Sequence, residues 1–437
     1  MFDSLRRQRG IFLLEVYRRV KKIRYRRRQV IREVFSRFRK QFLHRYYPDD
    51  RRAERLFRKD LKKLSANFSR LFLFQYSLFS RYWFHRHIYR SVVLKGQHED
   101  TLEKVVSASG NGVLFYFPNH QAHIDSMIIS YAAKQLHLPQ PMFIAWNTLA
   151  RRRSSYLMPL VNSCLLDREV MDSRFRPSDP FRNTRNYRAG YTRLFNEYVK
   201  HMLSKGVDTL IYPEGGRSYS GMTGEARIRR VFKTAGEAQD SLSGKKEIFI
   251  VPVSLSFSLV PEADELIRAW QEGSFLPPSS LFHDMQHGDD IYASFRPRYK
   301  TATDFPLIRQ YAEKCNPVYC VIGDPVSLRQ NNPTLEECFD EVRNNLRILP
   351  SHFVARLIIT GNLDRVTEVG LVIPARELRD RLPPDQLDEA YYDEAGLKDI
   401  LSIGLEFFRH SGAITPGGSV DDRLILEYYS NKCRTEA

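Results

Sequence analysis

The chain has 437 residues, enough for two or three domains, and its 42% hydrophobic and 27% charged residues exclude both a disordered chain and a polytopic membrane protein. Its formal net charge of +17 is confined to residues 1–100, where 28 Lys and Arg face 9 Asp and Glu, whereas residues 101–437 carry 40 against 42. This segregation excludes a uniformly basic nucleic-acid coat and indicates a basic module attached to a nearly neutral body.

The first forty residues are predicted to form a basic amphipathic helix. Two interpretations stay open: a solvated face packed on the body through its apolar stripe, or a surface that adsorbs to anionic lipid. Nucleic acid is not expected as a partner because no fold signature for it accompanies the cations. The stripe, with Arg27 as its one break, consists of Val16, Val20, Ile23, Val30, Val34 and Phe38.

Targeting and membrane-spanning signals were sought in the same region. The apolar run 11–14 ends at Glu15, too short for a cleaved secretory signal, although an Arg-rich, acid-poor start also fits a mitochondrial transit peptide. The apolar run 71–79 stops before Arg81, short of the ~18 residues that a spanning helix needs. With Tyr82-Trp83-Phe84 it suits a bilayer interface, so residues 1–100 are expected to be a membrane-facing helical region.

From residue 113 onward the pattern changes to short apolar runs that alternate with helical periodicity. This alternation predicts an α/β fold with a mixed, largely parallel sheet flanked by helices. Gly206 is expected to cap the helix predicted at 187–202. Residues 320–322 are expected to add an edge strand. The predicted elements are strand 113–117, helix 125–136, strand 141–146, helix 187–202, strand 208–212 and strand 248–257.

After about residue 330 the pattern is helical throughout. Helices are predicted at 335–346, 351–359 and 397–408, the last ending near Gly412. The expected division is therefore a basic helical region at 1–100, an α/β domain at 101–330 and a helical C-terminal subdomain at 331–437.

The first chemical motif, Pro118-Asn119-His120-Gln121-Ala122-His123-Ile124-Asp125, directly follows the strand 113–117. Open α/β sheets place their sites at such carboxyl ends of strands. His120 and Asp125 would not share a helix face, so His120 is expected in a turn with Asp125 in the first helical turn. The carboxylate could then fix the tautomer of the imidazole for proton abstraction from a hydroxyl, or it could merely be a stabilising first-turn charge.

The second motif, Tyr212-Pro213-Glu214-Gly215-Gly216-Arg217-Ser218, also follows a predicted strand. The two glycines let backbone N–H groups approach a ligand, and Arg217 offers a planar fork for phosphate or carboxylate. The alternative is an ordinary Gly-Gly turn with a surface arginine. A third feature, Val251-Pro252-Val253, places proline inside a strand, which predicts an edge, a bulge or a strand end that supports the pocket.

These three blocks, in this order, resemble the glycerolipid acyltransferase superfamily, with its His-x4-Asp, Glu-Gly-(Gly/Thr)-Arg-Ser and Val-Pro motifs. The Gly-Gly form is similar to the glycerol-3-phosphate 1-O-acyltransferases and dihydroxyacetone-phosphate acyltransferases. The likeness covers roughly residues 100–431, but Gln121 stands where the family usually has an arginine. Further matching segments are His123, Lys233-Thr234-Ala235-Gly236, Gly323-Asp324-Pro325-Val326-Ser327-Leu328 and Tyr428-Tyr429-Ser430-Asn431.

The resemblance implies transfer of a fatty acyl group from acyl-CoA or acyl-carrier protein to the sn-1 hydroxyl of glycerol-3-phosphate, giving lysophosphatidate for phospholipid synthesis. His120 would be the general base and Asp125 its orienting partner. Dihydroxyacetone phosphate and lysophosphatidate are the alternative acceptors, and no metal or organic cofactor is required. The residues expected to bind the acceptor are Glu214, Gly215, Gly216, Arg217 and Ser218, with Arg168 and Lys233 as outer candidates.

The expected location is the cytoplasmic face of a membrane, bound peripherally to an anionic surface (the inner membrane if the source is bacterial). The five scattered cysteines form no disulfide framework, which favours a reducing compartment. Two other functions stay open. A metal-dependent phosphohydrolase would use His120, His123 and Asp125 with the cluster at 283–290, and a non-catalytic basic membrane adaptor would use the fold alone.

Overall fold

The computed structural model describes residues 25–69, 71–73, 75, 92–122, 124–147, 158–171, 176–242, 246–260, 263–272 and 318–433. Several features predicted from the sequence lie outside these residues. They are the stripe positions Val16, Val20 and Ile23, the segment Tyr82-Trp83-Phe84 with most of the run before it, His123, and the cluster at 283–290.

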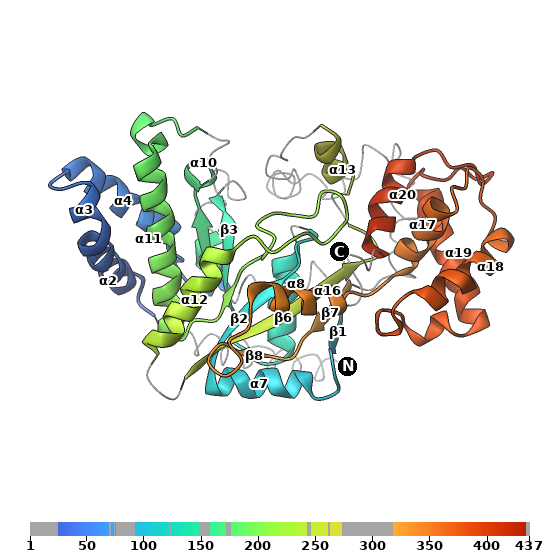
Figure 1. Ribbon diagram of the computed structural model, residues 1–437, viewed down its shortest axis with the longest axis horizontal. Helices are drawn as coiled ribbons and strands as arrows, with labels where there is room; N and C mark the ends of the chain where they lie inside the picture. Colours follow the sequence, from blue (N-terminus) through green and yellow to red (C-terminus); the bar gives the residue numbers. More distant parts are fainter. Residues whose placement is uncertain are drawn as a thin grey trace, which may run out of the picture.

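An eight-stranded sheet forms the centre of the molecule, between two groups of helices (Figure 1). The strand order is β1-β7-β6-β2-β5-β3-β4, with β8 paired to β6. Strands β6, β2, β5, β3 and β4 run parallel, whereas β7 and β8 are antiparallel to β6. The predicted mixed, largely parallel sheet is therefore confirmed. The strands are β1 (Val92–Gly96), β2 (Gly112–Pro118), β3 (Met142–Trp146), β4 (Ser163–Leu166), β5 (Thr209–Leu210), β6 (Glu247–Phe257), β7 (Val318–Ile322) and β8 (Val326–Ser327).

Two expectations about strand position were wrong. β7, expected at an edge, lies between β1 and β6 because Val92–Gly96, which precedes the motif at 118–125, adds a further parallel strand beside it. Pro252 lies within the central strand β6 rather than at an edge or end. Its carbonyl accepts from the nitrogen of Gly323 at 2.9 Å, so its own nitrogen faces the gap between the β8 and β7 pairings, where no N–H donor is required.

Helices cover both faces of the sheet, and the side chains of β2 alternate between them with the period of two that a strand imposes. Val113, Phe115 and Phe117 pack with α2, α4, α11, α12 and α16, whereas Leu114 and Tyr116 pack with α8, α13 and the C-terminal helices. The helices are α2 (Arg27–Phe38), α3 (His44–Tyr46), α4 (Arg51–Leu64), α7 (Thr101–Asn111), α8 (Asp125–Gln135), α10 (Arg168–Met171), α11 (Arg185–Ser204), α12 (Arg229–Ser241), α13 (Ala263–Gln271), α16 (Leu335–Asn344), α17 (Pro350–Thr360), α18 (Glu368–Arg381), α19 (Glu394–His410) and α20 (Arg423–Ser430), with short turns η1 (Arg39–Leu43), η4 (Met158–Val161), η5 (Pro180–Asn183), η7 (Pro384–Gln386), η8 (Glu389–Tyr391) and η9 (Asn431–Cys433).

The basic N-terminal helices α2 and α4 dock on α11 at one end of the molecule (Figure 1). The predicted stripe residues Val30, Val34 and Phe38 are buried there, and Phe57 of α4 stacks on Tyr187 of α11 with ring centroids 4.3 Å apart. The cations of these helices lie on the outer side, so apolar packing and a cationic surface coexist. Among the described residues, no helix combines the length and the apolar character needed to cross a membrane.

At the other end of the molecule, α17, α19 and α20 pack together, and the predicted helices at 351–359 and 397–408 are present as α17 and α19. The helix expected at 335–346 is present as α16, but it packs on β6 and β2. The sequence analysis did not predict α18 or α20. α20 leads into η9, which returns the chain to the centre of the sheet.

Candidate active site

The first motif forms a tight turn between β2 and α8. The Nδ1 atom of His120 lies 2.8 Å from Oδ2 of Asp125, the first residue of α8, so the predicted contact is present. Asp125 is fully buried and also accepts backbone N–H groups, from Gln121 at 2.7 Å and from Ala122 at 3.0 Å. Three donors therefore hold one carboxylate, and these bonds fix the turn around it.

This geometry defines the tautomer of His120. When Nδ1–H donates to Asp125, the lone pair resides on Nε2, which is the nitrogen able to take a proton from a substrate hydroxyl. The ring stacks on Tyr212, with centroids 3.8 Å apart and planes 15° apart. About a fifth of the His120 side chain is exposed, which makes it accessible to a small polar molecule. The arrangement suits general base catalysis.

The second motif joins the first because β5 pairs with β2, so the loops that follow the two strands are neighbours. Glu214 accepts the backbone N–H of His120 at 2.7 Å on one oxygen and that of Gly224 at 2.7 Å on the other. In return, the nitrogen of Ser218 donates to the carbonyl of His120 at 2.9 Å. Two hydrogen bonds therefore lock the His120 turn to the Glu214 loop.

Glu214 is buried, and this burial raises its pKa to about 7, against the lowering effect of the N–H groups of Gly224 and His120. A buried carboxylate whose oxygens each accept a backbone donor is a structural clamp rather than a surface charge. The sequence analysis assigned Glu214 to acceptor binding. The structure places both of its oxygens on backbone donors of the two loops.

The glycines of this loop leave open space beside it. Gly215 adopts a φ of 71°, a conformation that favours glycine, and a Cβ atom at Gly215 or Gly216 would meet no atom of the described residues within 4 Å. Arg217 follows directly and is half-buried, and the hydroxyl of Ser218 donates to the carbonyl of Met222. Gly215, Gly216 and Arg217 thus border an open edge of the loop, whereas Ser218 shapes it from inside.

The two outer candidates lie on other elements. Arg168 begins α10 after β4, and its backbone nitrogen donates to Oδ1 of Asn147 at 3.2 Å. β4 is three strand positions from β2, which corresponds to about 14 Å at the usual spacing of ~4.8 Å. Lys233 is exposed on α12. The hydrogen bonds that join the His120 turn to the Glu214 loop involve neither of them.

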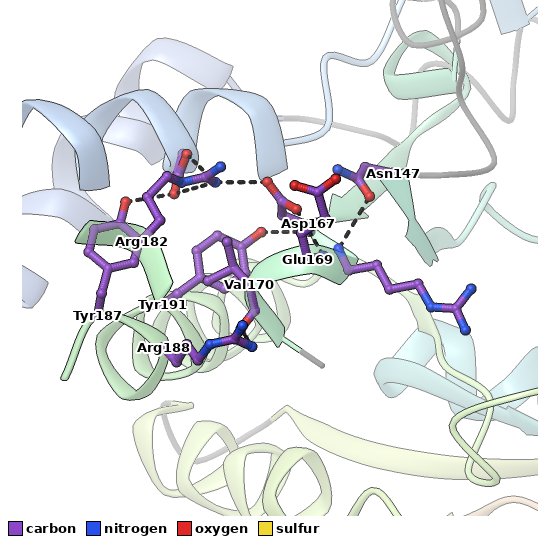
Figure 2. A network of polar contacts seen from close by, with 10 residues as sticks. Asn147, Asp167, Glu169, Val170, Arg182, Tyr187, Arg188 and Tyr191 are labelled. Carbon is purple, nitrogen blue, oxygen red and sulfur yellow. Dashed lines mark hydrogen bonds and ion pairs between the residues drawn. The ribbon is translucent and has the colours of Figure 1, made fainter. Parts of the chain in front are cut away.

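A polar network surrounds Asp167, the residue that precedes Arg168 in the chain (Figure 2). Arg182 donates to Asp167 at 2.7 Å and to both carboxylate oxygens of Asp60 at 3.0 and 3.1 Å, while the hydroxyl of Tyr187 donates to Asp60 at 2.8 Å. Asp60 belongs to α4, so this network ties the basic N-terminal helices to the segment that carries Arg168. Arg182 and Tyr187 therefore make contacts that hold these two parts of the fold together.

Lys432 lies near the site, although it was not predicted from the sequence to do so. The ammonium group of Lys432, in η9, donates to Oε1 of Gln121 and interacts electrostatically with Asp125 and Glu214. The resemblance included Tyr428-Tyr429-Ser430-Asn431 and stopped one residue short of it. No local pattern could have connected Lys432 with Gln121, because 311 positions separate them.

Within the described part of the chain, no group of three His, Cys, Asp or Glu side chains could hold a metal ion. The phosphohydrolase alternative depended on His123 and on the cluster at 283–290, which lie outside that part. Among the described residues, His120 and Asp125 contact each other, and Asp125 and Glu214 both accept backbone N–H groups.

Comparison with known proteins agrees with this geometry. Residues 97–258, which include both motifs, match the family model described as "Acyltransferase". The glycerol-3-phosphate acyltransferase of Pseudomonas paraeruginosa is 30% identical over 183 residues, 41% of this chain and 19% of that protein. The enzyme of the same name from Pseudomonas entomophila is 28% identical over 248 residues, 56% of this chain and 24% of that protein.

The matches therefore span about a fifth of the length of these curated relatives. A crystal structure described as the 1-acyl-sn-glycerophosphate (LPA) acyltransferase PlsC of Thermotoga maritima is also similar, with 13% sequence identity and a TM-score of 0.29. That similarity covers 76% of this chain and 83% of the other chain.

Proposed function

Since the chain contains an acyltransferase domain at residues 97–258, we propose that it transfers a fatty acyl group from acyl-CoA or acyl-carrier protein to the sn-1 hydroxyl of glycerol-3-phosphate. The observation that carries this proposal is the contact of 2.8 Å between Nδ1 of His120 and Asp125, in a turn locked to the Glu214 loop. The product would be lysophosphatidate, and the reaction would be the first step of phospholipid synthesis.

The chemical step uses one base. Nε2 of His120 takes the proton of the acceptor hydroxyl as its oxygen attacks the thioester carbonyl, and Asp125 stabilises the imidazolium that forms. Collapse of the tetrahedral intermediate breaks the carbon–sulfur bond, and the imidazolium returns the proton to the thiolate, giving an ester and a free thiol. General base catalysis contributes about 10²–10⁴-fold to such a step, and it requires neither a metal nor an organic cofactor.

The acceptor phosphate is assigned to Arg217, since a planar guanidinium pairs with two phosphate oxygens at once. The open space beside Gly215 and Gly216 supports this assignment, because a phosphate can approach the backbone there. Arg168 and Lys233 stay outer candidates that would act on a longer acceptor or on the donor. Three carbons separate the phosphate and the sn-1 hydroxyl of glycerol-3-phosphate, so Arg217 and His120 would hold the two ends of one molecule.

The choice of acceptor is supported by the names of the relatives that match the domain, which are glycerol-3-phosphate acyltransferases. The deciding experiment offers the purified protein labelled acyl-CoA, or acyl-carrier protein, with glycerol-3-phosphate, dihydroxyacetone phosphate and lysophosphatidate in parallel. Glycerol-3-phosphate is expected to give the highest kcat/KM. Turnover of lysophosphatidate alone would overturn the assignment.

We also propose that the protein works while bound peripherally to the cytoplasmic face of an anionic membrane, where its lipid product enters the bilayer. The supporting observation is a row of exposed cations on α4 that includes Arg55, Lys59, Lys62 and Lys63, at spacings of one helix face. The opposite face, with Phe57 and Leu61, is buried against the body, so the cations are presented outward.

A further inference from the structure

The C-terminal end of the described chain contacts both loops of the candidate active site. The glycine at position 221 is required by this contact, because a Cβ atom there would lie 2.0 Å from the carbonyl oxygen of Tyr428. Asn431 donates from Nδ2 to the carbonyl of Ser220 at 2.8 Å. Since residues 220 and 221 continue the loop that begins at Glu214, the segment 428–432 is docked on that loop.

Lys432 extends from this docked segment into the site. Its ammonium group donates to Oε1 of Gln121, which is the residue after His120, and lies 4.8 Å from the centroid of the Tyr428 ring. Gln121 is 3% exposed, so this hydrogen bond is made inside the protein. A largely buried lysine usually has acidic partners. The groups around Lys432 therefore indicate which part of the site its charge acts on.

Titratable groups face Lys432 from several elements. Asp125 at the start of α8 and Glu214 after β5 are the acids, and His352 of α17, Cys433 of η9 and the Tyr428 ring of α20 also lie beside it. Burial lowers the pKa of His352 to about 3 and raises that of Cys433, so both are uncharged at neutral pH. Lys432 therefore provides a positive charge that faces the two carboxylates of the site.

Lys432 and the two acidic residues affect the pKa of one another. Lys432 keeps some contact with solvent, yet the surrounding protein desolvates its ammonium group and lowers its pKa to about 7, against the raising effect of Asp125 and Glu214. Conversely, the charge of Lys432 lowers the pKa of Glu214, which burial has raised to about 7. Without Lys432, the pKa of Glu214 would rise further, and this carboxyl group would be protonated at neutral pH.

We propose that Lys432 is a positioning residue for acyl transfer: it holds the Gln121 side chain and places a positive charge beside Glu214 and Asp125, so that the His120 turn retains its catalytic geometry. This inference rests on the proposed function. It assigns to the C-terminal subdomain a direct part in a site whose two recognised motifs both belong to the α/β domain.

The mechanism behind the proposal is hydrogen bonding by Glu214. As a carboxylate it accepts the N–H groups of His120 and Gly224 with one oxygen each. When Glu214 is protonated, one of its oxygens becomes a hydroxyl group, which is a poorer acceptor. One of the two hydrogen bonds, from His120 or from Gly224, is then weakened. Activity should therefore fall at low pH as Glu214 takes up a proton, and removal of Lys432 should move this fall to higher pH.

The test compares pH profiles of kcat/KM for wild type, Lys432→Met, Lys432→Arg and the control Lys398→Met, an exposed lysine of α19. For Lys432→Met, the acid limb is expected about one pH unit higher, the order of shift that loss of a nearby opposite charge causes. Lys432→Arg and Lys398→Met should keep the wild-type limb. In a Glu214→Gln background, Lys432→Met should cause no further shift.

A second readout does not depend on turnover. The 13C signal of the Glu214 carboxyl group, identified by its loss in Glu214→Gln, should titrate near pH 7 in wild type and at higher pH in Lys432→Met. If wild type transfers no acyl group but this shift occurs, the proposed function fails, while the electrostatic coupling of Lys432 to Glu214 stands. An unshifted carboxyl signal overturns the positioning role of Lys432, as does a raised KM for glycerol-3-phosphate with an unchanged acid limb.

Discussion

Glu214 accepts the backbone N–H of His120 at 2.7 Å, although 94 positions separate the two residues in the chain. The bond forms because β2 and β5 are adjacent parallel strands whose carboxyl ends lie at the same edge of the sheet. In the proposed mechanism, one motif supplies the base, and the other supplies both the clamp on its turn and the arginine for the acceptor. Each of these parts can be tested by a single substitution.

Replacing the base tests the chemical step. We expect His120→Ala to lower kcat/KM with glycerol-3-phosphate by about 10²–10⁴-fold, with an unchanged melting temperature, because Asp125 keeps its backbone donors from Gln121 and Ala122. The control is His98→Ala, an exposed histidine after β1, which should retain activity. Full activity of His120→Ala would rule out the mechanism.

Replacing the arginine tests the phosphate subsite. Arg217→Ala should raise the KM for glycerol-3-phosphate by about 10–100-fold, since a hydrogen bond to a charged group contributes about 1.5–3 kcal/mol. The KM for acyl-CoA should stay within about twofold if the arginine contacts only the acceptor. Arg227→Ala, an exposed arginine of the same loop, is the matched control. An equal rise in both KM values would instead assign Arg217 to the donor or to the shape of the loop.

The sequence predicted the parts of this site that depend on local pattern. The strand before His120, the helix that begins at Asp125 and the strand before the Glu214 loop each follow from a short local pattern of apolar and polar residues. Their order then placed both motifs at carboxyl ends of strands. Residues only five positions apart, at the two ends of one short turn, lie close together in space. The contact between His120 and Asp125 could therefore be expected as well.

Features that depend on long-range pairing could not be predicted in this way. Pro252 was expected at an edge, a bulge or a strand end because proline lacks a donor, but it lies inside β6, where β8 and β7 leave a gap opposite its nitrogen. The edge position expected for 320–322 was wrong because β1, which pairs beside it, precedes it by more than 200 residues. Lys432 approaches Gln121 only after the C-terminal helices have packed.

The raised pKa of Glu214 has a consequence for stability. Burial raises this pKa from 4.5 to about 7, so between these values the folded protein retains a proton that the unfolded chain has released, and stability falls as the pH rises. Glu214→Gln cannot titrate. Urea unfolding should therefore show the variant gaining stability relative to wild type from pH 4.5 to 7, by up to about 3 kcal/mol, and no further above pH 7.

The matched control for this measurement is Glu225→Gln, which removes an exposed carboxylate from the same loop. It should show the same pH dependence of unfolding as wild type. A constant difference between Glu214→Gln and wild type from pH 4.5 to 7 would mean that Glu214 titrates at its ordinary pH in the folded protein.

The membrane proposal is tested on the exposed face of α4. Neutralising Lys59, Lys62 and Lys63 together to Gln should weaken binding to anionic vesicles by about 100-fold, since each cation near such a surface contributes about 1 kcal/mol. Added salt should weaken binding of the wild type. Deleting residues 1–48 is a less specific test, because it also removes the buried Val34 and Phe38.

The control removes the same net charge elsewhere, as Lys246→Gln, Arg365→Gln and Lys398→Gln in one variant, all three residues being exposed. This triple variant should bind anionic vesicles nearly as tightly as wild type. If both triple variants lose affinity equally, the total charge governs binding rather than the α4 face, and the orientation proposed for the protein on the membrane is wrong.

The docking of the basic helices depends on Asp60, whose carboxylate is 3% exposed and lies between Arg182 and Tyr187. Asp60→Ala should lower the free energy of unfolding by about 3 kcal/mol, because it leaves a buried arginine with one acidic partner and a tyrosine without its acceptor. Glu54→Ala, on the same helix, removes only exposed pairs and should cost less than about 1 kcal/mol. Equal effects in urea unfolding would mean that the apolar contacts alone hold α4 on the body.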